Sequence, residues 1–270
     1  MFTKLLAYEI RSRYRTDARS FGAFIVTIVI ASGIVAAGLP GVSGSTAVLA
    51  YALCALTPVA CAIAAMADYW KTLYGQRGYF TMSLPISGRV IFWAKNTRIA
   101  IECLLALALS VGGIIAVASA AAWSEGISLA EYTAGPRSLA AGVPTSTVVI
   151  MIVVQVILSL SWIVQGSAVM SIGAQGRFNH LGFGAPIIGF VLVYVVDQVL
   201  TAVGTFFIPL SVTTGGHFST EIMWTSYRAT MGTDGQPNVI GIGSYILVPL
   251  FALFLAMWAS RSIEKRTSLR

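Results

Sequence analysis

Two acidic residues, Glu102 and Asp197, lie inside long apolar stretches, where a charged side chain is costly and usually has a function. Arg98 precedes Glu102 by four positions. On a helix these two side chains would face each other, so the spacing favours a paired carboxylate near the membrane surface. Asp197 has no cation within four positions. Three roles stay open for it: a place in a substrate path, proton binding, or a hydrogen bond to another helix.

Gln155 is a polar residue in another apolar stretch, and Ser159, Trp162 and Gly166 share its helical face. Small and polar residues on one face usually serve helix–helix contacts in a membrane. The pattern therefore favours packing, with a place in a translocation path as the alternative.

Motifs for catalysis, nucleotide binding and metal binding are missing from the sequence. There is no G-x-x-x-x-G-K-[ST] phosphate loop. Gly41-Val-Ser43-Gly44 matches the G-x-S-G of rhomboid proteases, but no predicted span contains the histidine that such a serine requires. The histidines, His180 and His217, are predicted on opposite sides of a membrane and cannot share a metal. We expect no enzyme activity, no catalytic residue, no metal and no cofactor bound by this chain.

The composition is that of an integral membrane protein. Of the 270 residues, 57% are hydrophobic and only 10% are charged, whereas about 25% are charged in a typical soluble domain. This excludes a soluble globule and a disordered chain. Three cysteines inside apolar stretches offer no disulfide framework. The net charge of +7 fits basic cytoplasmic loops better than nucleic-acid binding.

Six apolar segments are long enough to cross a bilayer, which takes about 20 residues each. We predict an all-α membrane protein that forms a single transmembrane domain over residues 1–270. The predicted spans are 21–39, 46–67, 99–122, 147–172, 182–204 and 241–260.

Basic residues predict the orientation of these spans. All but two of the 17 Lys and Arg residues fall on the side that carries both termini, and the two exceptions are Arg137 and Arg228. Because cytoplasmic loops carry an excess of Lys and Arg, both termini are predicted to be cytoplasmic. We expect a multi-pass protein of the cell membrane.

The segments between the spans carry further signals. In 1–20, apolar Phe2 and Leu5 share an arc opposite several basic residues, although Glu9 and Arg13 interrupt that arc. This pattern indicates an interfacial amphipathic helix, with a purely basic anchor as the alternative. The outer segments 123–146 and 205–240 do not span; in 205–240, short apolar patches between glycines suggest short or re-entrant helices.

The 68–98 segment is the longest on its side. Tyr69 with Leu73, and Trp70 with Tyr74, are spaced by four positions, so a short helix there would present an aromatic face. Such a helix could dock a soluble partner, or it could rest as an aromatic belt on lipid headgroups.

This run of aromatic residues and glycines from Tyr69 to Pro85, followed by Ile91 and Lys95, resembles the loop after the second span of ABC-2-type transporter permeases. In particular it resembles six-span permease subunits of bacterial exporters for antimicrobial peptides, drugs and lantibiotic immunity. The layout of the whole chain is similar as well. A long outer 123–146 segment departs from the pattern.

The resemblance implies a permease subunit of an ATP-binding cassette exporter, driven by a separate ATPase subunit that holds ATP and Mg. It also implies a dimer with a second permease copy or paralogue. The loop between the second and third spans would be a coupling helix that docks the ATPase, and Leu84 and Pro85 would orient the helix that follows. The implied docking residues are Tyr69, Trp70, Leu73, Tyr74, Arg77, Gly78 and Tyr79.

Under this hypothesis Asp197, Gln155 and Glu102 are candidates for the translocation path. The principal alternative is an ion-coupled secondary transporter that uses Asp197, although the inverted repeats typical of such proteins are not evident. A membrane-embedded enzyme and a scaffold that recruits a cytoplasmic partner are further alternatives.

Overall fold

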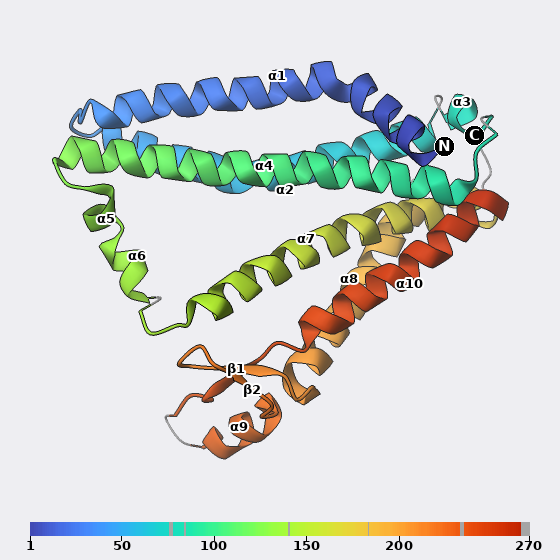
Figure 1. The fold of residues 1–270 in the computed structure, drawn as a ribbon. Helices are drawn as coiled ribbons and strands as arrows, with labels where there is room; N and C mark the ends of the chain where they lie inside the picture. Colours follow the sequence, from blue (N-terminus) through green and yellow to red (C-terminus); the bar gives the residue numbers. More distant parts are fainter. Residues whose placement is uncertain (76–77, 84, 140, 183, 233–234, 266–270) are drawn as a thin grey trace. The chain divides into compact units, whose positions relative to one another are not determined.

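Six long helices dominate the computed structural model (Figure 1). It describes all residues except 76–77, 84, 140, 183, 233–234 and 266–270. Within the described residues, six helices are long and apolar enough to cross a membrane. This confirms the prediction of a helical, multi-pass membrane protein. The six helices are α1 Phe2–Ala36, α2 Ser43–Leu73, α4 Gly88–Glu125, α7 Thr145–Gly173, α8 Gly184–Phe207 and α10 Ser244–Lys265.

The helices extend beyond the predicted spans because they continue into polar sequence. α4 has 38 residues, which corresponds to a length of about 57 Å at about 1.5 Å per residue. The hydrocarbon core of a bilayer is only about 30 Å thick. The first turns of α4, which begin 11 residues before the predicted span, therefore belong to the helix and not to a loop.

Two compact units make up the chain. The N-terminal unit comprises residues 1–69 and 93–141, with α1, most of α2 and α4, and the short helices α5 Leu129–Tyr132 and α6 Ala134–Leu139. The C-terminal unit comprises residues 70–92 and 142–270. It holds α3 Gly78–Met82, α7, the 3₁₀ helix η1 Gly176–Leu181, α8, α9 Met223–Thr230, three short strands and α10.

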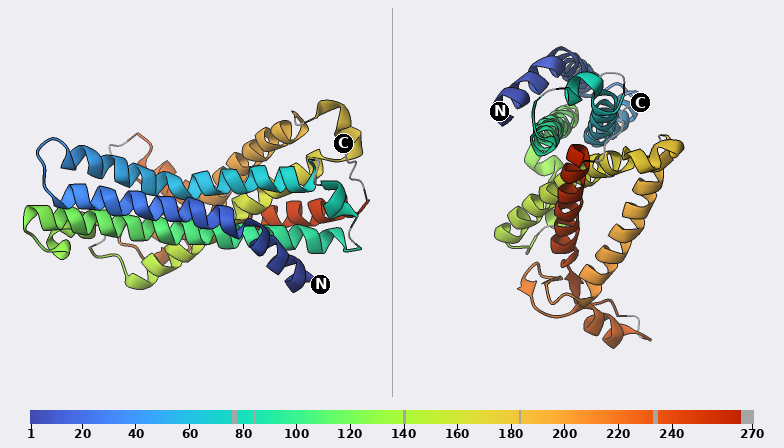
Figure 2. Two further views of the ribbon diagram at one scale, coloured as in Figure 1. Left: turned by 90° about the horizontal axis from the view of Figure 1, so that it is seen from above. Right: turned by 90° about the vertical axis from the view of Figure 1, so that its right-hand side faces the viewer.

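In the N-terminal unit, α1, α2 and α4 lie side by side (Figure 2). Phe24, Ile28, Cys54 and Val117 form the centre of their apolar contact. A Cβ atom added at Gly113 of α4 would lie 2.7 Å from Sγ of Cys54 on α2. The glycine thus allows these two helices to approach closely.

The N-terminal stretch 1–20 is not separated from the first span, since α1 is continuous from Phe2 to Ala36. Figure 2 shows its first turns diverging from the direction of the rest of α1. Phe2, Ile10 and Tyr14 are exposed, whereas Leu5 and Glu9 are buried. The exposed apolar side chains are compatible with an interfacial helix, and that assignment stays a prediction.

The C-terminal unit is built on α7, α8 and α10. Glycines again mark the close approaches: a Cβ atom at Gly173 would lie 2.8 Å from the backbone nitrogen of Pro186, and one at Gly189 would lie 2.7 Å from Cγ1 of Val169. Ser262 of α10 donates a hydrogen bond of 3.3 Å to the backbone oxygen of Ser171 on α7.

The segment 205–240 contains one short helix, α9, as predicted, but it also contains a small sheet that was not predicted. Among the described residues of this segment, the last turn of α8 and the short helix α9 are helical. The strands β1 Ser211–Thr213, β2 Phe218–Ser219 and β3 Val239–Gly241 form an antiparallel sheet in the order β2-β1-β3. Gly216, with a φ of +78°, makes the turn between β1 and β2, a conformation that favours glycine. Short strands with sequence-distant pairing, such as Val212 opposite Ile240, carry too little periodicity to be recognised from sequence.

Candidate functional site

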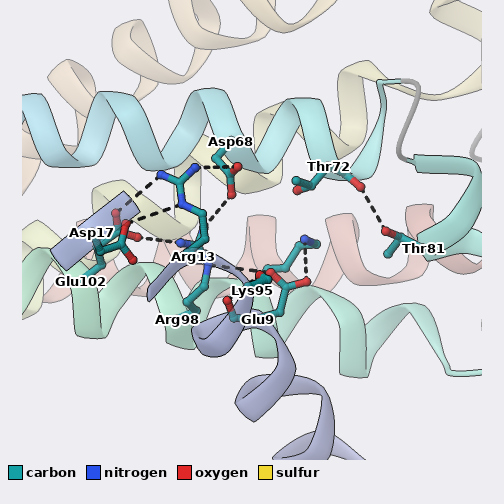
Figure 3. A network of polar contacts seen from close by, with 10 residues as sticks. Glu9, Arg13, Asp17, Asp68, Thr72, Thr81, Lys95, Arg98 and Glu102 are labelled. Carbon is teal, nitrogen blue, oxygen red and sulfur yellow. Dashed lines mark hydrogen bonds and ion pairs between the residues drawn. The ribbon is translucent and has the colours of Figure 1, made fainter. Parts of the chain in front are cut away.

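Seven ionisable side chains from three helices meet in the N-terminal unit, and we call them the charge cluster (Figure 3). Three are basic and four are acidic. They are Glu9, Arg13 and Asp17 of α1, Asp68 of α2, and Lys95, Arg98 and Glu102 of α4.

The most buried pair of the charge cluster joins α1 to α4. Nζ of Lys95 lies 2.8 Å from Oε1 of Glu9, and the two side chains are only 3% and 9% exposed. At such burial the attraction is poorly screened by water and salt. The pair therefore fixes the N-terminal turns of α1 against α4.

Arg98 contacts carboxylates from all three helices. Its Nη1 lies 2.7 Å from Oε2 of Glu102, which confirms the pair predicted from their spacing. Its Nη2 lies 3.2 Å from Oδ2 of Asp68, and its Nε lies 3.8 Å from Oε2 of Glu9. A planar guanidinium with five donors suits such a multiple contact better than a lysine would.

Arg13 makes the second set of contacts across the helices. Its Nη1 donates a hydrogen bond of 2.7 Å to Oδ1 of Asp68 on α2, and its Nε lies 3.6 Å from Oδ1 of Asp17 on α1. Its Nη2 also lies 3.9 Å from Oε1 of Glu102. Glu9 and Arg13, which interrupt the apolar arc of 1–20, are thus the residues that tie α1 to its neighbours.

The chemistry of the charge cluster is that of a structural clamp. Each acid of a buried pair is matched by a base, which offsets part of the cost of removing the charges from water. Removal of one partner of a buried ion pair typically costs about 3–5 kcal/mol. Glu102, a predicted path residue, is a member of this clamp.

The predicted docking residues lie in the last turns of α2 and in the segment between α2 and α4. Tyr69 and Leu73 have no exposed surface, and Tyr74 is also buried. The rings of Trp70 and Tyr74 are 5.3 Å apart, as expected for side chains one helical turn apart. In this conformation the three buried side chains anchor the end of α2, and their role in docking stays a prediction.

Two of the predicted docking residues after α2, one on α3 and one after it, are exposed. Tyr79 is 54% exposed, and Pro85 is exposed as well. Thr81 donates a hydrogen bond of 3.1 Å to the backbone oxygen of Thr72 (Figure 3), which attaches α3 to the last turn of α2. Two predicted residues, Arg77 and Leu84, lie outside the described part of the chain.

Gly88, at the start of α4, packs against the C-terminal turns of α10. A Cβ atom there would lie 2.8 Å from Cγ2 of Ile263 and 3.0 Å from the backbone nitrogen of Glu264. The segment is thus attached to α2 at one end and to α10 at the other. This second attachment was not predictable, since a glycine before a helix usually marks only a turn.

Asp197 has a partner on another helix. Nε2 of Gln165 on α7 donates a hydrogen bond of 3.1 Å to Oδ1 of Asp197 on α8, which was one of the three roles left open for it. Gln155 is exposed and lies about 15 Å further along α7. Gln165 was missed although it lies in the same predicted span as Gln155 and carries the same sequence signal, a polar residue in an apolar stretch.

Comparison with protein-family models, with curated proteins and with solved structures finds no match to this chain.

Proposed function

We propose that this chain is the permease subunit of an ATP-binding cassette exporter of the ABC-2 type. It works as a dimer with a second permease copy or paralogue, with both termini in the cytoplasm. A separate ATPase subunit supplies the free energy of ATP hydrolysis. The proposal rests on the resemblance of the 68–98 segment and on the way that segment is attached to the helices.

The observation that carries the proposal is the double attachment of the segment between α2 and α4. The bond from Thr81 to Thr72 ties α3 to α2, and Gly88 packs on Ile263 of α10. A force applied to the exposed surface around Tyr79 would therefore reach two spans at once. This is what a coupling helix requires, because it must convert closure of an ATPase pair into a rigid-body movement of helices.

The charge cluster supports the same mechanism in the N-terminal unit. Glu9, Arg13 and Asp68 join the N-terminal turns of α1 to α2 and α4 through contacts of 2.7–2.8 Å. Helices tied at one end in this way move as one body when that end is displaced. The clamp would keep α1 in step with α2, the helix that leads into the coupling segment.

The ion-coupled alternative depends on Asp197 as a proton carrier. The hydrogen bond from Gln165 supports an interhelical packing role instead. Polar contacts of this kind between membrane helices contribute about 0.6 kcal/mol on average. We therefore do not favour that alternative.

Exposure decides which docking residue to test. Leu73 and Tyr74 are buried, so alanine at either position would disturb folding as well as docking. Tyr79→Ala removes a side chain that is 54% exposed. Tyr194→Ala is the matched control, since Tyr194 is 63% exposed on α8.

The measurement is co-purification of an ATPase with each tagged variant from native membranes in mild detergent. We expect Tyr79→Ala to weaken the association by about 30-fold, which corresponds to about 2 kcal/mol for loss of an interface anchor. Tyr194→Ala should retain the wild-type amount. Equal recovery of the ATPase with both variants would remove α3 as the docking site.

A further inference from the structure

A cavity of about 330 Å³ lies in the C-terminal unit between α7, α8 and α10. This volume is at the lower end of the range of about 300–1,000 Å³ found for small-molecule sites. Aliphatic and aromatic side chains form nearly all of its wall, among them Leu192, Phe254 and Trp258. Among the described residues that line it, Arg177 is the only charged one.

The cavity opens to the surface of the predicted spans. Leu192 is 61% exposed, Phe254 54% and Trp258 41%. The surface of a transmembrane helix that no other part of the chain covers faces lipid. The cavity is therefore accessible from the bilayer.

The length of the cavity matches the thickness of one leaflet of the bilayer. Along α8 the lining runs from Ala185 to Val196, which is a rise of about 17 Å at about 1.5 Å per residue. The hydrocarbon core is about 30 Å thick, so each leaflet contributes about half of that. A single extended acyl chain has the length and the apolar character that this cavity accommodates.

The charge lies at one end of the cavity. Arg177 belongs to η1, which joins α7 to α8, and its guanidinium carbon lies 4.5 Å from the centre of the Phe178 ring. Within the described residues, no carboxylate forms an ion pair with Arg177. α8 begins nearby at Gly184, and the first turn of a helix favours negative charge.

A second cation, on α10, adds positive charge at the same end of the cavity. Arg261 follows Trp258 by three positions and Phe254 by seven, so helical periodicity puts it on the face that lines the cavity. The 173–181 loop, between the fourth and fifth predicted spans, is on the side that the charge distribution predicts to be cytoplasmic. The end of the cavity is thus positive at the level where lipid headgroups lie.

We propose that this cavity binds an anionic glycerophospholipid of the cytoplasmic leaflet. Its acyl chain lies between α8 and α10, and its phosphate contacts Arg177. The apolar wall disfavours free inorganic phosphate, and the cation at the mouth favours an acidic headgroup over a zwitterionic one. The site belongs to the C-terminal unit alone and exists whether or not an ATPase binds the chain.

The test is a count of retained lipids. The full chain is reconstituted into nanodiscs that contain equal amounts of phosphatidylglycerol and phosphatidylcholine, and it is re-extracted in mild detergent for native mass spectrometry. Wild type should retain phosphatidylglycerol in preference. Arg177→Gln should lower the ratio of phosphatidylglycerol to phosphatidylcholine by about fivefold, the effect of one basic residue near an anionic surface.

Two further variants separate the cavity from its mouth. Leu192→Trp fills the cavity and should reduce retention of both lipids. Arg15→Gln removes an exposed cation of the N-terminal unit and should leave the ratio unchanged. Thermal melting of each variant in detergent checks that it is folded, and the Arg177→Gln result stands by itself if Leu192→Trp does not fold.

Several outcomes would overturn the proposal. An unchanged lipid ratio in Arg177→Gln would show that the cation does not recognise the headgroup. If added inorganic phosphate releases phosphatidylglycerol, the site binds the phosphate of the headgroup alone and the acyl chain does not contribute to binding. The Leu192→Trp variant could instead be a monomer where the wild type is a dimer, with an unchanged number of retained lipids. That result would mean that a second copy of the chain, and not a lipid, occupies the cavity.

Discussion

The ion pair between Lys95 and Glu9 gives the sharpest prediction for stability. Its atoms are 2.8 Å apart, and the two side chains are 3% and 9% exposed. Two unit charges about 4 Å apart attract each other by about 4 kcal/mol at an effective dielectric constant of about 20. Glu9→Gln removes this attraction and leaves the Lys95 ammonium buried, so we expect a loss of about 3 kcal/mol in the free energy of unfolding.

A double-mutant cycle isolates the contribution of the pair. Lys95→Met should lower the free energy of unfolding by about 2 kcal/mol. This loss is smaller than that of Glu9→Gln, because Glu9 still has the Arg98 guanidinium at 3.8 Å when Lys95 is replaced. The double variant, Glu9→Gln with Lys95→Met, should cost less than the sum of the single variants. We expect a coupling free energy of about 2 kcal/mol, within the range for residues in direct contact.

Thermal melting in detergent is the assay. For a chain of about 150–250 residues, 1 kcal/mol shifts the Tm by about 2–4 °C, so Glu9→Gln should lower the Tm by roughly 6–12 °C. Lys4→Met is the control, because Lys4 is exposed on the same helix; it should change stability by less than about 0.5 kcal/mol. If the stability losses of the two single variants add up to the loss of the double variant, the two side chains do not stabilise each other and the clamp is refuted.

Two other substitutions test the attachment of the segment between α2 and α4 and the role of Asp197. The Cβ atom of Gly88→Ala would lie 3.0 Å from the backbone nitrogen of Glu264, so this substitution should destabilise the chain by about 1–3 kcal/mol and reduce ATP-driven transport. Gly112→Ala is the control, because the space around Gly112 is open. In the same melting and transport assays it should be neutral or stabilising. Asp197→Asn keeps an oxygen that accepts from Gln165 and should leave export in proteoliposomes intact, whereas loss of transport would favour the ion-coupled alternative.

Local patterns in the sequence predicted much of the architecture. Hydropathy alone placed the six long helices, because a spanning segment must be apolar along its whole length. The pair Arg98 and Glu102 was predictable for a similar reason, since four positions make one helical turn. These features depend on neighbours in sequence only.

Features that depend on which helices pack together were not predictable. Glu9 and Lys95 are 86 positions apart, and nothing in the sequence of either helix indicates the other. In the sequence pattern Glu9 is only an interruption of an amphipathic arc. An acid on the apolar face of a helix can nevertheless signal a buried partner of opposite charge.

Burial of the aromatic face of α2 shows a further limit of pattern reasoning. The spacing of Tyr69 and Leu73 predicts a shared face equally well for an exposed docking surface and for a buried anchor. Both side chains are fully buried in the structure. Tyr79 on the separate helix α3 is exposed instead, and its spacing from Tyr69 and Leu73 gives no indication of that difference.

The most direct test of the proposed function is purification of the tagged wild-type chain from native membranes in mild detergent, followed by identification of every protein that is recovered in near-equal amount. The account predicts an ATPase subunit with a phosphate loop, together with ATPase activity in the purified complex. A chain that purifies alone, folded and without ATPase activity, would contradict it.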